Sequence, residues 1–226
     1  MRRTVLVHTI LLFIPIALGI LLCQMIQAQS HMIRMEEVGE SIRGAWWFAN
    51  HRVFQGLSSH IGWYAQVTAI YTLFGFHLFA ARYYRVVLAV LSCIALISLL
   101  KRYMGETWGA ILVVLSFVLS PVYLYYSTMG IHFGVDLSYI PLALYVLDML
   151  SRARTNRPWR ELSHAVFWGC IMIFWMSYPT MIAYLPSLIY LYGWHVLSRL
   201  PQERRTEIAA SVLGFLIPLR VGLLWI

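Results

Sequence analysis

The sequence has 226 residues, of which 61% are hydrophobic and only 12% are charged. This balance leaves too little polar surface to cover a soluble globule, so it excludes an ordinary soluble domain and favours a protein in lipid. The formal net charge is +8, but the basic residues form short clusters between apolar runs, and we expect no nucleic-acid partner. The three cysteines lie in apolar runs without paired spacing, which indicates neither a disulfide framework nor a metal site.

Apolar runs, taken in chain order, predict an all-α polytopic membrane protein. Each crossing needs roughly 20 mostly apolar residues in a helix, which gives about seven spans in one module over residues 1–226. These spans are predicted near residues 5–28, 79–100, 108–127, 134–150, 163–178, 181–198 and 208–226. The first run lacks a small-x-small cleavage pattern, which favours an uncleaved span over a signal peptide. The last run ends without a polar flank, as expected of a fragment of a longer chain.

The first long loop, residues 29–78, contains two stretches with the character of interfacial helices. One stretch has an apolar stripe at helical spacing, formed by Met35, Val38, Ile42, Ala45 and Trp46. The other, residues 61–76, is short, rich in Tyr and Trp, and interrupted by Gln66 and Thr68. We expect both to lie on the outer membrane surface as amphipathic juxtamembrane helices. A short true span at 61–76 is the alternative, but it would move the later basic clusters outside.

Basic residues are distributed unevenly between the predicted loops. The segments on the N-terminal side of the membrane hold Arg2, Arg3, Lys101, Arg102, Arg152, Arg154, Arg157, Arg160, Arg199, Arg204 and Arg205. The segments on the other side hold far fewer. The positive-inside rule therefore predicts a cytoplasmic N-terminus.

Acidic residues cluster in the first outer loop. Only nine acidic residues are present, and Glu36, Glu37 and Glu40 lie within five positions of one another. A carboxylate at the membrane surface is suited to general-base catalysis, because it can accept a proton from an acceptor hydroxyl during attack on a carbon. The alternative is a solvated helix face on which Glu40 pairs with Arg43.

Other polar residues are expected near the same surface. Arg82 and Arg85 lie at the outer end of the second span, where their guanidinium groups would either bind a lipid phosphate or extend to headgroups. His60 is a candidate for the same phosphate or for a metal. Asp136 and His132 lie at the outer start of the fourth span, where an ionisable group usually faces a cavity.

In order and spacing, these motifs resemble the GT-C superfamily of membrane glycosyltransferases, especially the family 39-like branch of protein mannosyltransferases and lipid A aminoarabinose transferases. In that branch an acidic pair opens the first outer loop, where this sequence has Glu36-Glu37 with Glu in place of the usual first Asp. Residues 59–64, Ser-His-Ile-Gly-Trp-Tyr, resemble the next motif without its usual Pro pair. Residues 73–82 resemble its Phe-Gly turn and Arg-led second span, and 120–127 its Ser-Pro and Tyr-rich stretch.

The resemblance implies an N-terminal GT-C module that transfers a sugar, with inversion, from a polyprenyl-phosphate donor to a protein, lipid or glycan acceptor on the outer face. It implies that Glu36 is the catalytic base, that Glu37 is its neighbour in the motif, and that His60 and Arg82 contact the phosphate. Arg85 and Asp136 are further candidates for substrate binding. No cofactor is indicated, and a multi-pass protein of a bacterial inner membrane is expected. The alternative is a non-catalytic transporter or scaffold, although the spans mostly lack the midplane ionisable residues of transporters.

Overall fold

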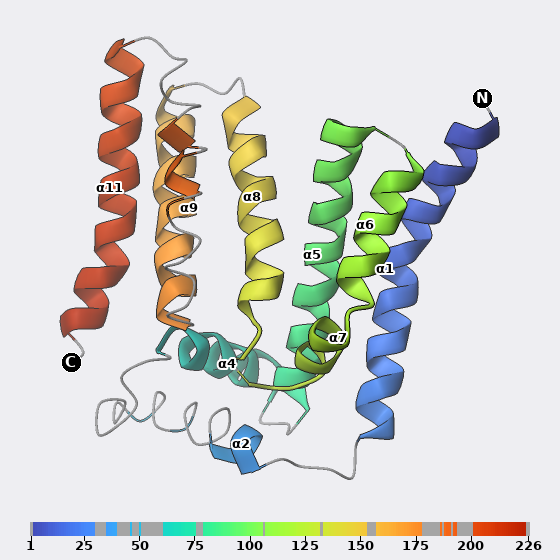
Figure 1. Ribbon diagram of the computed structural model, residues 1–226. Coiled ribbons are helices and arrows are strands. Elements are labelled where there is room, and N and C mark those ends of the chain that lie inside the picture. Colours follow the sequence, from blue (N-terminus) through green and yellow to red (C-terminus); the bar gives the residue numbers. More distant parts are fainter. Residues whose placement is uncertain are drawn as a thin grey trace. The chain divides into compact units, whose positions relative to one another are not determined.

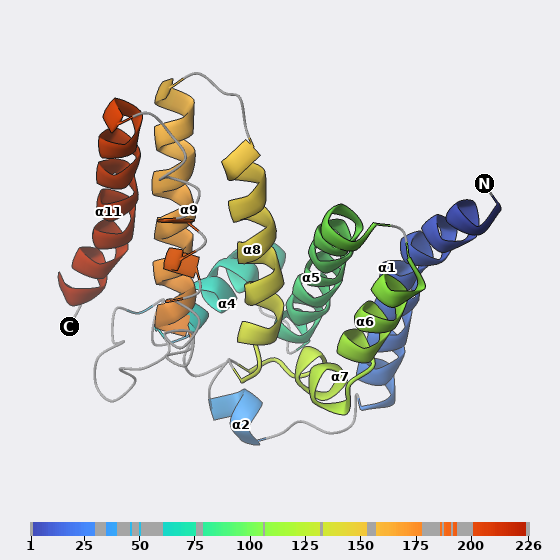
Figure 2. The ribbon, with the colours of Figure 1, turned by 45° about the horizontal axis from the view of Figure 1, so that its top comes forward.

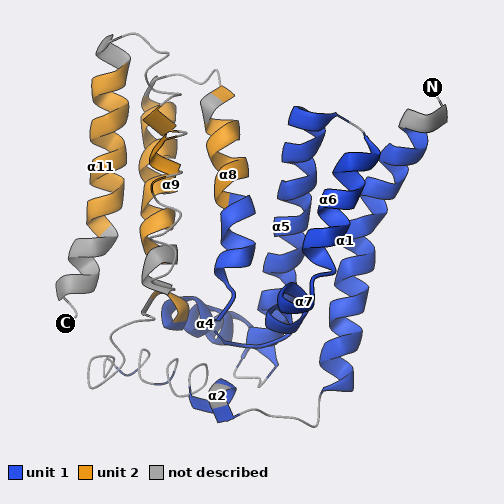
Figure 3. Cartoon of the chain, in the orientation of Figure 1, with its two compact units in different colours: residues 1–51, 64–142 blue, residues 52–63, 143–226 orange. Residues whose placement is uncertain are grey.

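The computed structural model describes residues 2–29, 35–39, 46, 50, 61–75, 79–105, 107–131, 133–152, 157–177, 186, 188–190, 192–193 and 201–224. Within these ranges every regular element is a helix, as the sequence predicted (Figure 1). The chain divides into two compact units (Figure 3). Unit 1 comprises Met1–His51 and Tyr64–Leu142, and unit 2 comprises Arg52–Trp63 and Ala143–Ile226.

Unit 1 is built around a bundle of long apolar helices. Its elements are α1 (Arg2–Ala28), α2 (Met35–Glu37), most of α4 (Ile61–Phe74), α5 (Ala80–Met104), α6 (Trp108–Val118), α7 (Pro121–Ser127) and the first part of α8 (Asp136–Arg152). The helices α1, α5 and α6 pack side by side (Figures 1 and 2). The core of this bundle includes Leu11, Leu18 and Leu22 of α1, Ala89 and Cys93 of α5, and Val114 of α6.

Two helices of unit 1 are long and apolar enough to cross a membrane, namely Val5–Ala28 within α1 and all of α5. The helices α6 and α7 add a third candidate if they are counted as one broken span, since they meet at 56°. Ser120 and Pro121 explain the break. The Ser120 hydroxyl caps α7 by accepting from the Tyr123 N–H over 3.2 Å, and proline at the first helical position starts a helix but cannot continue one.

The helices α1 and α5 run antiparallel, as two consecutive spans should. At one end Lys101 Nζ lies 3.0 Å from His8 Nδ1, and at the other Arg82 Nη1 lies 3.5 Å from the Gln29 carbonyl oxygen. Arg82 and Lys101 are separated by about 28 Å along the helix axis, close to the thickness of the hydrocarbon core. Helices of this length and apolarity would place the Arg82 end and the Lys101 end of the pair on opposite sides of such a core.

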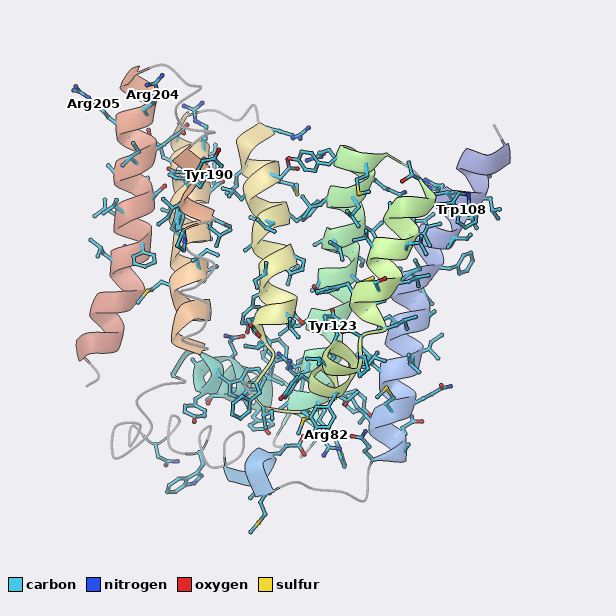
Figure 4. The ribbon with its side chains drawn as sticks, in the orientation of Figure 1. Arg82, Trp108, Tyr123, Tyr190, Arg204 and Arg205 are labelled. Carbon is cyan, nitrogen blue, oxygen red and sulfur yellow. The ribbon has the colours of Figure 1, made fainter. Side chains whose placement is uncertain are left out.

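Unit 2 contains the last part of α8, together with α9 (Arg157–Ser177) and α11 (Pro201–Leu224), which lie side by side (Figure 1). A buried ion pair of Arg160 with Glu207 links α9 to α11. The two backbones touch, because a Cβ placed on Gly214 would come within 2.0 Å of the Ala165 carbonyl oxygen. Arg204 and Arg205 lie together near one end of α11 (Figure 4).

The helices α8, α9 and α11 occupy positions where the sequence predicts spans. Among the described residues, however, only the helices of unit 1 named above reach the length and apolarity of a membrane crossing. Most of the predicted span at 181–198 lies outside the described residues. The full set of predicted spans therefore stays a prediction, while the all-helical class is confirmed.

Candidate functional site

A buried ion pair joins α2 to the first turn of α5. Arg82 donates from Nε to Glu37 Oε1 over 2.7 Å and from Nη2 to Glu37 Oε2. Glu37 is 6% exposed and Arg82 is 4% exposed. When a guanidinium binds a carboxylate through two parallel hydrogen bonds, both the distance between the two groups and their relative orientation are fixed. Glu37 therefore holds the backbone of α2 beside Arg82 at the end of α5 (Figure 4).

The connection between α7 and α8 supplies a third donor to the same carboxylate. The Gly130 N–H donates to Glu37 Oε1 over 2.8 Å. This connection lies directly on the first turn of α5, because a Cβ on Gly130 would lie 3.1 Å from Ala81 Cβ and 3.4 Å from the Arg82 nitrogen. With the contact of Arg82 to Gln29, the ion pair brings together the end of α1, α2, the start of α5 and the α7–α8 connection.

Arg85, one turn further along α5, shapes that connection. Arg85 is only 1% exposed. Its Nη2 donates to the Tyr126 carbonyl oxygen over 3.0 Å and to the Phe133 carbonyl oxygen over 3.2 Å. Asp136, the first residue of α8, interacts electrostatically with Arg85. Arg85 thus fixes both ends of the segment that carries Gly130.

The helix α4 is attached to the same region through a side-chain amide. Gln66 Oε1 accepts hydrogen bonds from the Tyr84 hydroxyl of α5, over 2.6 Å, and from the Tyr139 hydroxyl of α8. Tyr71, one turn and a half further along α4, is buried. Burial, and secondarily the negative charge of Glu37, raise the pKa of Tyr71 to about 12. The phenol of Tyr71 is therefore close enough to Glu37 to be affected by its charge.

The structure brings some of the predicted site residues together. Glu37 contacts Arg82, and Arg85 interacts with Asp136, which places four of the predicted residues around one end of α5. The backbone of Glu36 lies in α2 beside Glu37, but its side chain is outside the described part of the structure. The positions of Glu40, His60 and His132 also lie outside the described residues.

Sequence reasoning missed the roles of Gly130, Gln66 and Tyr71. The signal for Gly130 was available, because two glycines, Gly130 and Gly134, interrupt the segment between two helices where close backbone approach is common. Gln66 was recognised only as a polar interruption of the stretch 61–76, and Tyr71 was only one of the aromatic residues in which that stretch is rich. Among the described residues, no group of three or more His, Cys, Asp and Glu side chains is arranged to hold a metal ion.

The family model for dolichyl-phosphate-mannose-protein mannosyltransferases matches residues 61–225, well over half of the chain. The chain belongs to this family. Membership of the mannosyltransferase family confirms the resemblance to GT-C glycosyltransferases that the motifs indicated, and with the long apolar helices it identifies an integral membrane protein. No curated protein and no solved structure matches the chain significantly.

The match to the mannosyltransferase family begins at the first residue of α4. It therefore includes Arg82, Arg85, Gly130 and Asp136 but not the acidic pair of α2. The link between the matched region and that pair is physical: the carboxylate of Glu37 is bound by groups that lie within the match.

Proposed function

We propose that this member of the mannosyltransferase family transfers a sugar from a polyprenyl-phosphate donor to an acceptor on the outer face of the membrane. The observation that carries the proposal is the bidentate ion pair of Glu37 with Arg82. It keeps α2, and with it the backbone of Glu36, beside a guanidinium at a helix end that would lie at the headgroup level. A carboxylate and a phosphate-binding cation are the two groups that this reaction needs from the protein.

In the proposed reaction, Glu36 accepts the proton of the acceptor hydroxyl as the hydroxyl oxygen attacks the anomeric carbon of the donor. The bond from that carbon to the phosphate oxygen breaks, and the configuration at the carbon inverts. The bonding electrons leave with the phosphate, so negative charge develops there. Arg82 stabilises this charge, and His60 is proposed as a second donor to the phosphate.

The proposed orientation puts this site on the extracytoplasmic side. Lys101 and His8 mark the opposite end of the α1–α5 pair, and Arg2, Arg3 and Arg102 belong to the same predicted cytoplasmic segments. By the positive-inside rule the Arg82 end then faces outward. We propose a multi-pass protein of a bacterial inner membrane with a cytoplasmic N-terminus, acting on a protein, lipid or glycan acceptor.

The test is sugar transfer by the full chain in proteoliposomes, with polyprenyl-phosphate mannose and other polyprenyl-phosphate sugars as donors. Loss of a general base typically lowers the rate about 100-fold or more, so Glu36→Gln should fall by that amount. Glu40→Gln, which removes an equal charge from the same loop, is the matched control and should keep the wild-type rate. An unchanged rate for Glu36→Gln would remove Glu36 from the mechanism. Transfer from a nucleotide sugar alone would refute the lipid-phosphate donor.

A further inference from the structure

The carboxylate of Glu37 is bound in the way that an external anion is bound. It accepts two N–H groups of the Arg82 fork and the backbone N–H of Gly130, with measured lengths of 2.7 Å from Arg82 Nε and 2.8 Å from Gly130. A guanidinium fork combined with a backbone N–H is also the donor set that proteins use for phosphate oxygens. The helix α2 supplies none of these three donors. It supplies only the anion.

The Gly130 N–H is held in place by contacts that do not involve Glu37. The Arg82 guanidinium, besides its bonds to Glu37, donates to the Gln29 carbonyl oxygen over 3.5 Å and lies 5.2 Å from the centroid of the Phe79 ring. Gly130 lies against Ala81 and the Arg82 backbone so closely that a methyl group would touch both. Arg85 fixes both ends of the connection through the carbonyl oxygens of Tyr126 and Phe133. The geometry of the anion-binding cradle, defined here as the Arg82 guanidinium and the Gly130 N–H, is therefore set by α5 and the α7–α8 connection.

The helix α2 turns Glu37 toward the protein and Met35 away from it. Glu37 is 6% exposed, whereas Met35 is 89% exposed and Val38 is 41% exposed. Met35 and Val38 belong to the apolar stripe that we expect to lie on the membrane surface. The ion pair is therefore a contact between α2 and the protein that the movement of one side chain would break.

These observations conflict with simultaneous binding of a donor phosphate. Arg82 is 4% exposed, and its Nε and Nη2 donors are directed to Glu37. We propose that the cradle is the phosphate site of the donor, and that the Glu37 carboxylate occupies it until the phosphate displaces it. This inference rests on the proposed function, because the ligand is the phosphate of a polyprenyl-phosphate donor. Displacement frees the Glu37 side chain and leaves α2, with Glu36, at the membrane surface beside the bound donor.

The test is calorimetric titration of the full chain in detergent with farnesyl phosphate, a short polyprenyl monophosphate. If Glu37 leaves the wild-type cradle unoccupied about a tenth of the time, removal of the Glu37 carboxylate should tighten the binding of farnesyl phosphate about tenfold. Glu37→Gln should show this gain, Arg82→Gln should lose binding, and Glu40→Gln, the charge-matched control, should bind like the wild type. Inorganic phosphate should show the same dependence on Glu37, and farnesol should not.

Equal or weaker binding of farnesyl phosphate by folded Glu37→Gln would refute the displacement of Glu37 by phosphate. The same effect of Glu37→Gln on the binding of farnesol would also refute it. If Glu37→Gln does not fold, hydrogen exchange of the wild type decides the question: farnesyl phosphate should speed exchange of the amides in residues 35–39, and unchanged exchange refutes displacement. The two proposals fail separately. Displacement of Glu37 by phosphate without any sugar transfer would remove the proposed function alone. Sugar transfer without tighter phosphate binding by Glu37→Gln would remove the displacement alone.

Discussion

Removal of one partner from the Glu37–Arg82 pair leaves a charge behind in a buried site. Arg82→Met should lower the free energy of unfolding by about 3–5 kcal/mol, because the Glu37 carboxylate then has lost its counter-charge. The double variant Glu37→Leu/Arg82→Met should recover much of that loss. Thermal and denaturant unfolding in detergent measure both effects.

The matched control is Arg152, which pairs with Asp148 over 3.0 Å while its side chain is 51% exposed. An exposed pair contributes about 0–1 kcal/mol, so Arg152→Met should have a small effect. Equal losses from Arg82→Met and Arg152→Met would contradict the burial argument.

Tyr71 reports the charge of Glu37 through its own ionisation. Its pKa is raised from 10.0 to about 12, chiefly by burial and then by Glu37. Because the folded-state pKa is the higher one, this contribution to stability is complete below pH 10 and is lost as the pH rises from 10 to about 12. In Glu37→Gln the Tyr71 pKa should fall but remain above 10.0, since burial is the larger cause.

The measurement is phenolate absorbance against pH, taken as the difference between each protein and the same protein carrying Tyr71→Phe. A Tyr71 titration at the same pH with and without the Glu37 carboxylate would show that the two groups do not interact.

At single positions the sequence predicted which residues gather but not how they pair. Glu37 was selected from the acidic cluster of the first outer loop and from the resemblance of Glu36-Glu37 to the family motif, whereas Arg82, Arg85 and Asp136 were selected from their positions at the outer ends of predicted spans. The partner of each was not predictable, because the pairing spans 45 positions from Glu37 to Arg82 and depends on how α2 folds back. The sequence also favoured Glu36 over Glu37, and the structure adds a role for Glu37.

Among the connecting elements, the segment between α7 and α8 depends on Gly134. Its φ is 65°, and a Cβ there would lie 2.7 Å from Tyr126 Cβ. Gly134→Ala should therefore cost about 3 kcal/mol or more, from backbone strain and overlap combined. It should also weaken phosphate binding, because the position of the Gly130 N–H changes with the segment.

Gly75 is the matched control for this substitution. Its φ is 79°, but a Cβ there would meet no atom within 4 Å in the described part of the chain. Gly75→Ala should cost only the strain of a left-handed residue, about 1 kcal/mol. Unfolding measurements on both variants separate strain from overlap, and equal losses would mean that the contact with Tyr126 is unimportant.

Helix positions were predictable to the extent that apolarity fixes them. The predicted spans at 5–28 and 79–100 correspond to α1 and α5, because a long apolar run has no alternative in lipid when its charges, such as Arg82 and Arg85, lie only near its end. The predicted span at 108–127 is instead the bent pair of α6 and α7. Its composition gave the apolar run correctly, but hydropathy does not distinguish a straight helix from one that restarts at Ser120-Pro121.

For the whole molecule, the orientation in the membrane is the prediction with the widest consequences. In a variant without native cysteines, a membrane-impermeant thiol reagent applied to spheroplasts should label Leu73→Cys, a position that is 75% exposed in α4. It should label Tyr103→Cys, 68% exposed at the other end of unit 1, only after permeabilisation. The opposite labelling pattern would reverse the orientation and put the proposed site in the cytoplasm.

The division of the chain into two units was not predictable from the sequence. Two of the boundaries fall inside α4 and inside α8, where no linker marks them. The third lies between His51 and Arg52, in the predicted first outer loop. Apolar runs report that each helix needs neighbours but not which neighbours it has.

The break between α6 and α7 separates membrane insertion from folding. The helix α6 has 11 residues, about 16 Å of axis, which is half of a hydrocarbon core of about 30 Å. A newly made chain that bent at Ser120 while surrounded by lipid would expose backbone carbonyls without partners. The run 108–127 should therefore enter the bilayer with only the smaller kink that Pro121 imposes on a helix. It should bend to 56° only once it packs against α5 and α1, so that the final shape of this segment is acquired late in biogenesis.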